Sequence, residues 1–294
     1  AARNHILIRD TSALEQMRNV DVVVFDKTGT LTEGHPTVIG WLWAQGQEEH
    51  YKDVLLAAES TSDHPLAEAI VTALEGEEQV IPAHLDGFES IAGKGVRVAY
   101  QGAEYWVGSH KLLKDYQANL SDILADMLTQ YESDGNSIVY FGRENDLLAV
   151  IAIKDQLRVT SMEAIRELRI QDIEICMLTG DGERTASSVA GSLGIMRFVA
   201  DAMPDDKEDF IHKLQLQGKT VAMVGDGVND ARALSCADVS IAMGKGTDTL
   251  MDTAMITLRT SDLLLLPKVF RLSRQTVSPV SYTHLRAHET KANL

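Results

Sequence analysis

The sequence predicts an α/β protein, in which a doubly wound parallel sheet is interrupted by a smaller, inserted α+β domain. Three observations lead to this fold class. The chain has 294 residues, enough for about two domains. Short, β-branched apolar runs alternate with helix-like stretches in its second half, whereas its middle third holds brief β runs separated by glycines. A parallel sheet split by an antiparallel insertion accounts for both patterns.

The first core strand is expected at residues 20–25, because a continuous apolar run that stops at a polar turn is typical of a strand buried on both faces. A further strand-like run covers 147–153 and introduces the alternating half of the chain. The elements predicted there are helix 159–169, strand 173–178, helices 183–193 and 205–216, strand 220–224, helix 229–236 and strand 239–242. Such alternation predicts parallel strands joined by helices.

The middle of the chain predicts a separate α+β unit. Two amphipathic helices, 51–59 and 65–74, precede β runs around Phe88, at 96–100 and at 105–107; a third helix and a run at 137–141 follow. Glycines mark the ends of these runs, as in the turns of an antiparallel sheet.

Composition excludes several classes of protein. With 27 basic and 43 acidic residues the net charge is -16, which repels a nucleic-acid backbone, so we expect no nucleic-acid partner. Cys176 and Cys236 show neither CxxC nor Cys/His spacing, which argues against a disulfide scaffold or a structural zinc site. A helix that crosses a bilayer needs about 18 consecutive apolar residues, and no apolar run in the sequence approaches this length. The chain as given is therefore expected to be soluble.

Three polar turns follow three of the predicted strands, at 26–32, 179–182 and 225–230. Ligands of parallel sheets bind at the carboxyl ends of the strands, so Asp26 should project into a crevice while Gly29 lets the next turn approach an anion. Asp226 is expected from a neighbouring strand end. Two facing carboxylates repel each other unless a cation lies between them, and Mg²⁺ suits this oxygen-rich setting.

Further side chains complete a phosphoryl-transfer site in this reading. Lys207, which follows Pro204 at a helix start, would place a positive charge on the transferred group, and the Thr179 hydroxyl would hold a phosphate oxygen. Asn229 and Asp230 would position these groups. Each turn alone is more often an ordinary loop, but the combination favours phosphoryl transfer.

The motif DKTGTLT at 26–32, together with TGD at 179–181 and GDGVNDA at 225–231, resembles P-type ATPases, which belong to the haloacid-dehalogenase-like superfamily. The resemblance implies that ATP phosphorylates Asp26 and that a β-aspartyl phosphate is the intermediate. It also implies Mg²⁺ bound by Asp26, the Thr28 backbone carbonyl and Asp226, and phosphoryl contacts from Thr179, Lys207 and Asn229. Asp155 and Arg158 match the family stretch that follows the inserted domain.

The inserted domain resembles that of heavy-metal-transporting members. Its Ser-Asp-His-Pro at 62–65 is similar to their Ser-Glu-His-Pro motif, with Asp63 in place of the usual Glu, and its glycines are similar to their nucleotide-domain glycine motif. ATP is therefore expected to contact Asp63, His64, Gly93, Gly95 and Gly102. The segments 4–10 and 33–36 favour copper-type pumps within this group.

The resemblance divides the chain into a phosphorylation domain at 1–33 and 147–276, a nucleotide-binding domain at 34–146, and a polar tail at 277–294 that we interpret as non-native. It implies ATP as substrate, and partners absent from this sequence: an actuator domain, transmembrane helices and the heavy-metal cation that they bind. The intact protein would be a membrane protein with this portion on the cytoplasmic side.

Two alternatives remain. The first is a soluble haloacid-dehalogenase-like phosphatase. It is disfavoured because such hydrolases place an acid/base Asp two positions after the nucleophile, where this chain has Thr28. The second is a nucleotide-binding regulatory module without catalysis.

Overall fold

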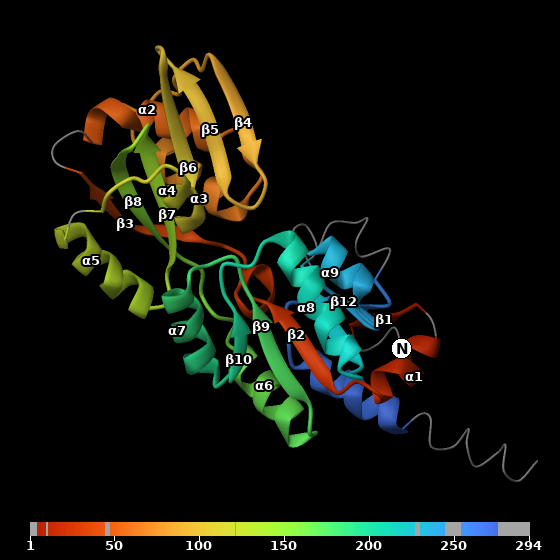
Figure 1. Ribbon diagram of the computed structural model, residues 1–294. Helices are drawn as coiled ribbons and strands as arrows, with labels where there is room; N and C mark the ends of the chain where they lie inside the picture. The colour runs from red at the N-terminus through yellow and green to blue at the C-terminus, as the bar shows by residue number, and fades with distance from the viewer. Residues whose placement is uncertain are drawn as a thin grey trace, which may run out of the picture.

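The computed structural model describes residues 5–9, 11–44, 48–120, 122–226, 230–244 and 254–275. Two β-sheets organise these residues (Figure 1). The chain begins in a seven-stranded sheet, leaves it for a six-stranded sheet and returns to the first. The predicted fold class, a parallel sheet with an α+β insertion, is confirmed.

The seven-stranded sheet has the order β1-β13-β12-β11-β2-β9-β10, and all neighbours are parallel except β1 and β13. The strand β2 thus lies between β9 and β11, so the turns after these three strands share one edge. Three short strands, β1, β10 and β13, were not predicted, because three residues show no periodicity. The strands are β1 Ile6–Ile8, β2 Val22–Asp26, β9 Glu174–Leu178, β10 Arg197–Val199, β11 Val221–Gly225, β12 Val239–Met243 and β13 Ile256–Leu258.

Helices cover both faces of this sheet, which explains the continuous apolar runs of its strands. Val23 and Phe25 of β2 face a core that contains residues of α1, α6 and α7, whereas Val22 and Val24 face a core with residues of α8 and α9. The helices are α1 Thr11–Arg18, α6 Ser161–Ile170, α7 Glu183–Leu193, α8 Pro204–Leu216 and α9 Ala231–Cys236.

The six-stranded sheet is antiparallel throughout and has the order β3-β8-β7-β6-β5-β4. Residues of α2 and α3 share a core with one face, and residues of α4 and α5 share a core with the other. The elements are β3 Thr37–Trp43, α2 Glu48–Glu59, α3 Pro65–Glu75, β4 Gly87–Ile91, β5 Gly95–Tyr100, β6 Ala103–Gly108, α4 His110–Asp115, α5 Asp122–Ser133, β7 Ser137–Arg143 and β8 Asp146–Lys154.

The placement of strand 147–153 in the parallel-sheet part was wrong. It forms β8, which pairs antiparallel with β3 and β7, so the two sheets divide after Lys154 and not at 146/147. The strand is buried on both faces, since Val150 belongs to the core with α4 and α5 while Ile151 belongs to the core with α2 and α3. A continuously apolar run does not distinguish these two kinds of sheet.

Within the described ranges, no helix combines the length and apolarity that a bilayer-crossing helix needs. The predicted tail, 277–294, lies outside these ranges.

Candidate active site

Asp26 is the last residue of β2, at the edge where the ends of β9 and β11 also lie. Lys207, in the first turn of α8, reaches it across the sheet edge: its Nζ donates to Asp26 Oδ1 at 2.6 Å and to Asp230 Oδ1 at 2.7 Å. All three side chains are nearly buried, with 9% of Lys207, 8% of Asp26 and 1% of Asp230 exposed. The structure therefore brings together three predicted site residues, with one ammonium bridging two carboxylates.

The protonation of this cluster follows from its burial. Burial lowers the pKa of Lys207, but the charges of Asp26 and Asp230 outweigh that effect and raise it overall, so the amine stays charged. Burial raises the pKa of Asp230 to about 7, with repulsion from Asp26 adding to the effect and Lys207 opposing it. Among the described residues, Asp230 Oδ2 has no hydrogen-bond partner although it is buried.

Asp226, which follows β11, packs against the turn that begins after Asp26. Gly29 in this turn has φ +72°, and a Cβ there would lie 2.2 Å from Asp226 Oδ2, so only glycine admits the carboxylate. Asp26 and Asp226 thus bring two carboxylates to one edge, and carboxylate oxygens are ligands that Mg²⁺ prefers. The donor chemistry fits the ion. Asn229 lies outside the described residues.

A second segment braces the turn Lys27–Leu31. Arg158 donates through Nε to Thr30 O at 2.9 Å and through a terminal guanidinium nitrogen to Gly29 O at 2.6 Å. Asp155 accepts a hydrogen bond from the Thr32 hydroxyl at 2.5 Å. These two residues, noted in the sequence only through the resemblance, fix the backbone of the turn that presents Asp26.

Lys27 makes a contact that the sequence analysis missed. Its Nζ lies 2.5 Å from Asp181 Oδ2 and donates to Ser137 Oγ at 2.9 Å. Burial alone would raise the pKa of Asp181, but the charge and hydrogen bond of Lys27, together with hydrogen bonds from Ser137 and Thr179, outweigh burial and lower the pKa overall. Because Ser137 begins β7, its hydrogen bond with Lys27 joins the six-stranded sheet to the edge where β2, β9 and β11 end. Lys27 and Asp181 both lie within motifs that the sequence analysis singled out, and this was the only sign in the sequence that they belong to the site.

A cavity of about 760 Å³ lies between the two sheet units, within the range of about 300–1,000 Å³ typical of ligand pockets. From the parallel-sheet side, Thr28 and Thr179 line it; from the other side, His64, Gly93 and Gly95 do. Asp26 and Lys207 are not part of its wall, although Thr28 lies two residues from Asp26. Five predicted site residues therefore surround one space beside the carboxylate cluster.

The far wall of the cavity has two features suited to a nucleotide. His64 caps α3, with Nδ1 accepting from Leu66 N at 3.2 Å. Although the residue remains accessible, surrounding protein atoms desolvate the ring and lower its pKa, so it is neutral. Gly95 has φ +144°, and a Cβ there would lie 2.0 Å from Val107 O. The glycine is therefore required by the close approach of β6, whereas the neutral ring offers a flat face to a ligand in the cavity.

Glu59 is a further residue that the sequence analysis missed. It lines the same cavity, is 5% exposed, and burial raises its pKa to about 8. A neutral carboxyl both donates and accepts hydrogen bonds, which suits a heterocyclic base. Its position at the end of α2 gave no signal, because a terminal glutamate of an amphipathic helix is usually exposed.

Two predicted nucleotide contacts are not brought to the cavity. Gly102 lies at the opposite end of the β5–β6 hairpin from Gly95, which pairs with Gly108, and a Cβ on Gly102 would meet nothing within 4 Å. Its φ of +76° shows that the hairpin turn requires this glycine. Asp63 is exposed and is not part of the cavity wall, although its neighbour His64 is.

Curated relatives match nearly the whole chain. A copper-exporting P-type ATPase of Staphylococcus epidermidis (strain ATCC 35984) is 38% identical over 95% of this chain and 35% of that protein. A copper-exporting P-type ATPase of Staphylococcus aureus (strain Newman) is 39% identical over 94% of this chain and 34% of that protein. The chain thus spans about a third of the length of these relatives, and the sequence resemblance to P-type ATPases is confirmed.

Solved structures give the same result. The catalytic domain of the CPx-ATPase CopB-B is 28% identical with a TM-score of 0.75, covering 92% of this chain and 96% of that one. A zinc-transporting PIB-type ATPase in the E2.Pi state is 36% identical with a TM-score of 0.61, covering 96% of this chain and 45% of that one. Since the model of one family also matches residues 20–238, the chain belongs to the haloacid dehalogenase-like hydrolases.

Proposed function

We propose that this chain is the ATP-hydrolysing catalytic core of a P-type pump that exports a heavy-metal cation, with copper as the favoured cargo. The observation that carries the proposal is the buried Lys207 ammonium between Asp26 and Asp230, beside a cavity of nucleotide size. The names of the curated relatives support copper, whereas one structural relative transports zinc.

In the proposed reaction the base of ATP occupies the cavity near His64 and Glu59, and the triphosphate extends toward Thr28 and Thr179. A carboxylate oxygen of Asp26 attacks the γ-phosphorus. A new O–P bond forms, the bond from the γ-phosphorus to the β,γ-bridging oxygen breaks, and ADP leaves with that electron pair. Lys207 orients the carboxylate through Oδ1 and offsets the negative charge that gathers during transfer.

Mg²⁺ would be held by Asp26, Asp226 and the Thr28 carbonyl, and when bound it supplies charge neutralisation for the phosphates. The chain's own contribution is to hold these oxygens in place. Arg158 and Asp155 fix the turn from behind, and Gly29 leaves room for the Asp226 carboxylate.

The phosphorylated Asp26 should be long-lived. Thr28 lines the cavity at the position where phosphatases of this superfamily carry an acid/base Asp, and its hydroxyl does not accept a proton from water at neutral pH. Slow hydrolysis allows the phosphoenzyme to drive a conformational change elsewhere in the intact protein. A soluble phosphatase remains the second candidate.

The test uses Asp26→Asn, with Asp209→Asn as the control because Asp209 is an exposed carboxylate on α8. With γ-labelled ATP and Mg²⁺, in a pump restored to full length, the parent and Asp209→Asn should form an acid-stable, hydroxylamine-labile label. Asp26→Asn should bind ATP but stay unlabelled. Labelling that survives the Asp26 change would refute the nucleophile assignment, and rapid turnover of simple phosphomonoesters by the purified chain would favour the phosphatase.

The chain spans about a third of the length of its curated relatives. We infer that the intact protein adds an actuator domain and membrane helices that bind the cargo cation, with this portion on the cytoplasmic side.

A further inference from the structure

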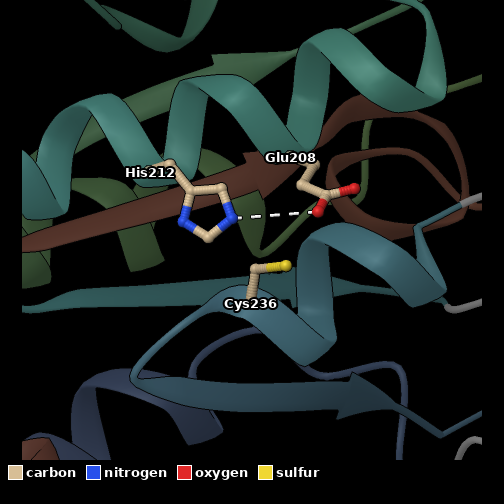
Figure 2. Close-up of side chains that lie close together, drawn as sticks. All are labelled: Glu208, His212 and Cys236. Carbon is tan, nitrogen blue, oxygen red and sulfur yellow. Dashed lines mark ion pairs between the residues drawn. The ribbon is translucent and has the colours of Figure 1, made fainter.

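Three potential metal ligands meet between α8 and α9, outside the proposed phosphoryl-transfer site. Glu208 and His212 stand four residues apart on α8 and therefore share one face of the helix, and Cys236 is the last residue of α9. One ligand atom from each lies within 4.8 Å of the other two, with 3.8 Å between His212 Nε2 and Glu208 Oε1. Figure 2 shows the three side chains gathered in the space between the two helices.

The side chain of Gln215 determines which nitrogen of His212 faces this space. Gln215 Nε2 donates to the Cys236 carbonyl at 2.9 Å, and a carbonyl only accepts, so the amide orientation is determined. Gln215 Oε1 then lies 3.2 Å from His212 Nδ1, which must carry the hydrogen because an amide oxygen cannot donate. The lone pair of neutral His212 is therefore on Nε2, directed toward Glu208.

This arrangement is the one that metal sites use. A ligating histidine commonly donates its other N–H to an oxygen acceptor, which orients the ring, and Gln215 provides that acceptor while also holding the backbone of Cys236. With this tautomer the Nε2 lone pair and a carboxylate oxygen face each other 3.8 Å apart, and a cation placed between them would be attracted by both.

The surrounding charges leave one carboxylate oxygen for a metal. Arg232 contacts Glu208 through Oε2 at 3.0 Å, whereas Oε1 is the atom on the His212 side. Arg232 also pairs with Asp205, so two carboxylates balance its charge. Burial raises the pKa of the Cys236 thiol, and a hydrogen bond to Glu208 adds to this effect. The thiol therefore keeps its proton until a metal displaces it.

We propose that Glu208, His212 and Cys236 form a Zn²⁺ site with three protein ligands and a fourth position for water. A carboxylate, an imidazole and a thiolate form a donor set that suits Zn²⁺, and bonds of about 2.0–2.3 Å place tetrahedral ligands roughly 3.3–3.8 Å apart. A nitrogen and an oxygen ligand need roughly 3.3–3.5 Å, so the observed 3.8 Å is slightly long, and side-chain movements of about 1 Å bring all three ligand atoms into range. On binding, the S–H bond is replaced by S–Zn and the proton goes to solvent.

Such an ion would connect the two helices that supply the phosphoryl-transfer cluster. Lys207 directly precedes Glu208 on α8, and Asp230 directly precedes α9. The proposed Zn²⁺ ion is not the transported cation, so the test of this site does not depend on the transport reaction.

The test is titration of the complete, metal-free chain with Co²⁺ as a spectroscopic substitute. The expected result is a thiolate-to-Co²⁺ charge-transfer band that saturates at one equivalent and disappears when Zn²⁺ is added. Cobalt at the Mg²⁺ site or on other histidines gives no such band, because neither offers a thiolate. Cys236→Ser should abolish the band, and Gln215→Ala should weaken Co²⁺ binding about 10- to 100-fold.

Two controls separate this site from general metal binding. Cys176→Ala removes the other, buried cysteine, and His84→Ala removes an exposed histidine elsewhere; both should keep the band and the affinity. Absence of the band in the parent chain would overturn the proposal. A band that persists in Cys236→Ser, or is lost in Cys176→Ala, would overturn it as well.

Discussion

Removing the ammonium of Lys207 should destabilise the fold strongly. In Lys207→Met, the carboxylates of Asp26 and Asp230 lose partners at 2.6 and 2.7 Å while they remain 8% and 1% exposed. Breaking a buried ion pair from one side costs about 3–5 kcal/mol, because the remaining charge is left unpaired in a poorly solvated site. We expect the lower end, about 3 kcal/mol, because Asp230 has a raised pKa and can take up a proton in response.

The measurement is urea denaturation of the complete chain, with Lys213→Met as the matched control. Lys213 is exposed on the same helix, so its loss should change the free energy of unfolding by no more than about 0.5 kcal/mol. Adding Asp230→Asn to Lys207→Met removes the cost of protonating Asp230 and should recover about 1–2 kcal/mol, which is within the usual coupling of contacting residues.

The reasoning fails if Lys207→Met and Lys213→Met destabilise the chain equally, or if Asp230→Asn gives no recovery in the Lys207→Met background. In the phosphorylation assay, loss of this charge should slow labelling of Asp26 by about 10²- to 10³-fold.

Two further predictions concern the cavity and the turn. The pKa of Glu59 is about 8 in the folded chain against an ordinary 4.5, so its stabilising contribution is full below pH 4.5 and is lost as the pH rises to 8. The free energy of unfolding, measured by urea denaturation, should therefore fall by about 4–5 kcal/mol across this range in the parent chain but not in Glu59→Gln. Parallel pH profiles of the two proteins would contradict this. Gly29→Ala places a Cβ 2.2 Å from Asp226 Oδ2, so the carboxylate must move about 1 Å and Mg²⁺-dependent labelling should fall about 10²-fold. Gly218→Ala is the control, because Gly218 has a similar φ of +79° and its Cβ would meet nothing within 4 Å; an equal effect would refute the steric argument.

Much of the candidate site was predicted from the rule that residues following neighbouring parallel strands meet at one edge of the sheet. Asp26, Asp226 and Thr179 follow strands that the apolar pattern already revealed, and parallel neighbours end at one edge, so their proximity follows from the strand order β11-β2-β9. Lys207 comes from a helix start, yet the geometry joins it to Asp26 as expected.

The failures have other causes. Gly102 was grouped with Gly93 and Gly95 through the resemblance to a glycine motif, but the strand β5, Gly95–Tyr100, lies between Gly95 and Gly102 and spans about 17 Å. The strand β8 was assigned to the wrong sheet because a run buried on both faces looks alike in both sheets.

The sequence by itself determined the fold class and the chemical character of the three turns, because apolar periodicity and motif spacing are local properties of the chain. Only the tertiary structure decided which distant side chains meet. Lys27 reaches Ser137, Glu59 becomes a neutral carboxyl in a cavity, and Cys236, whose spacing in the sequence argued against a structural zinc site, lies beside His212. The physical reason is that burial and charge pairing depend on helix packing and sheet order, which bring together residues that no sequence interval relates.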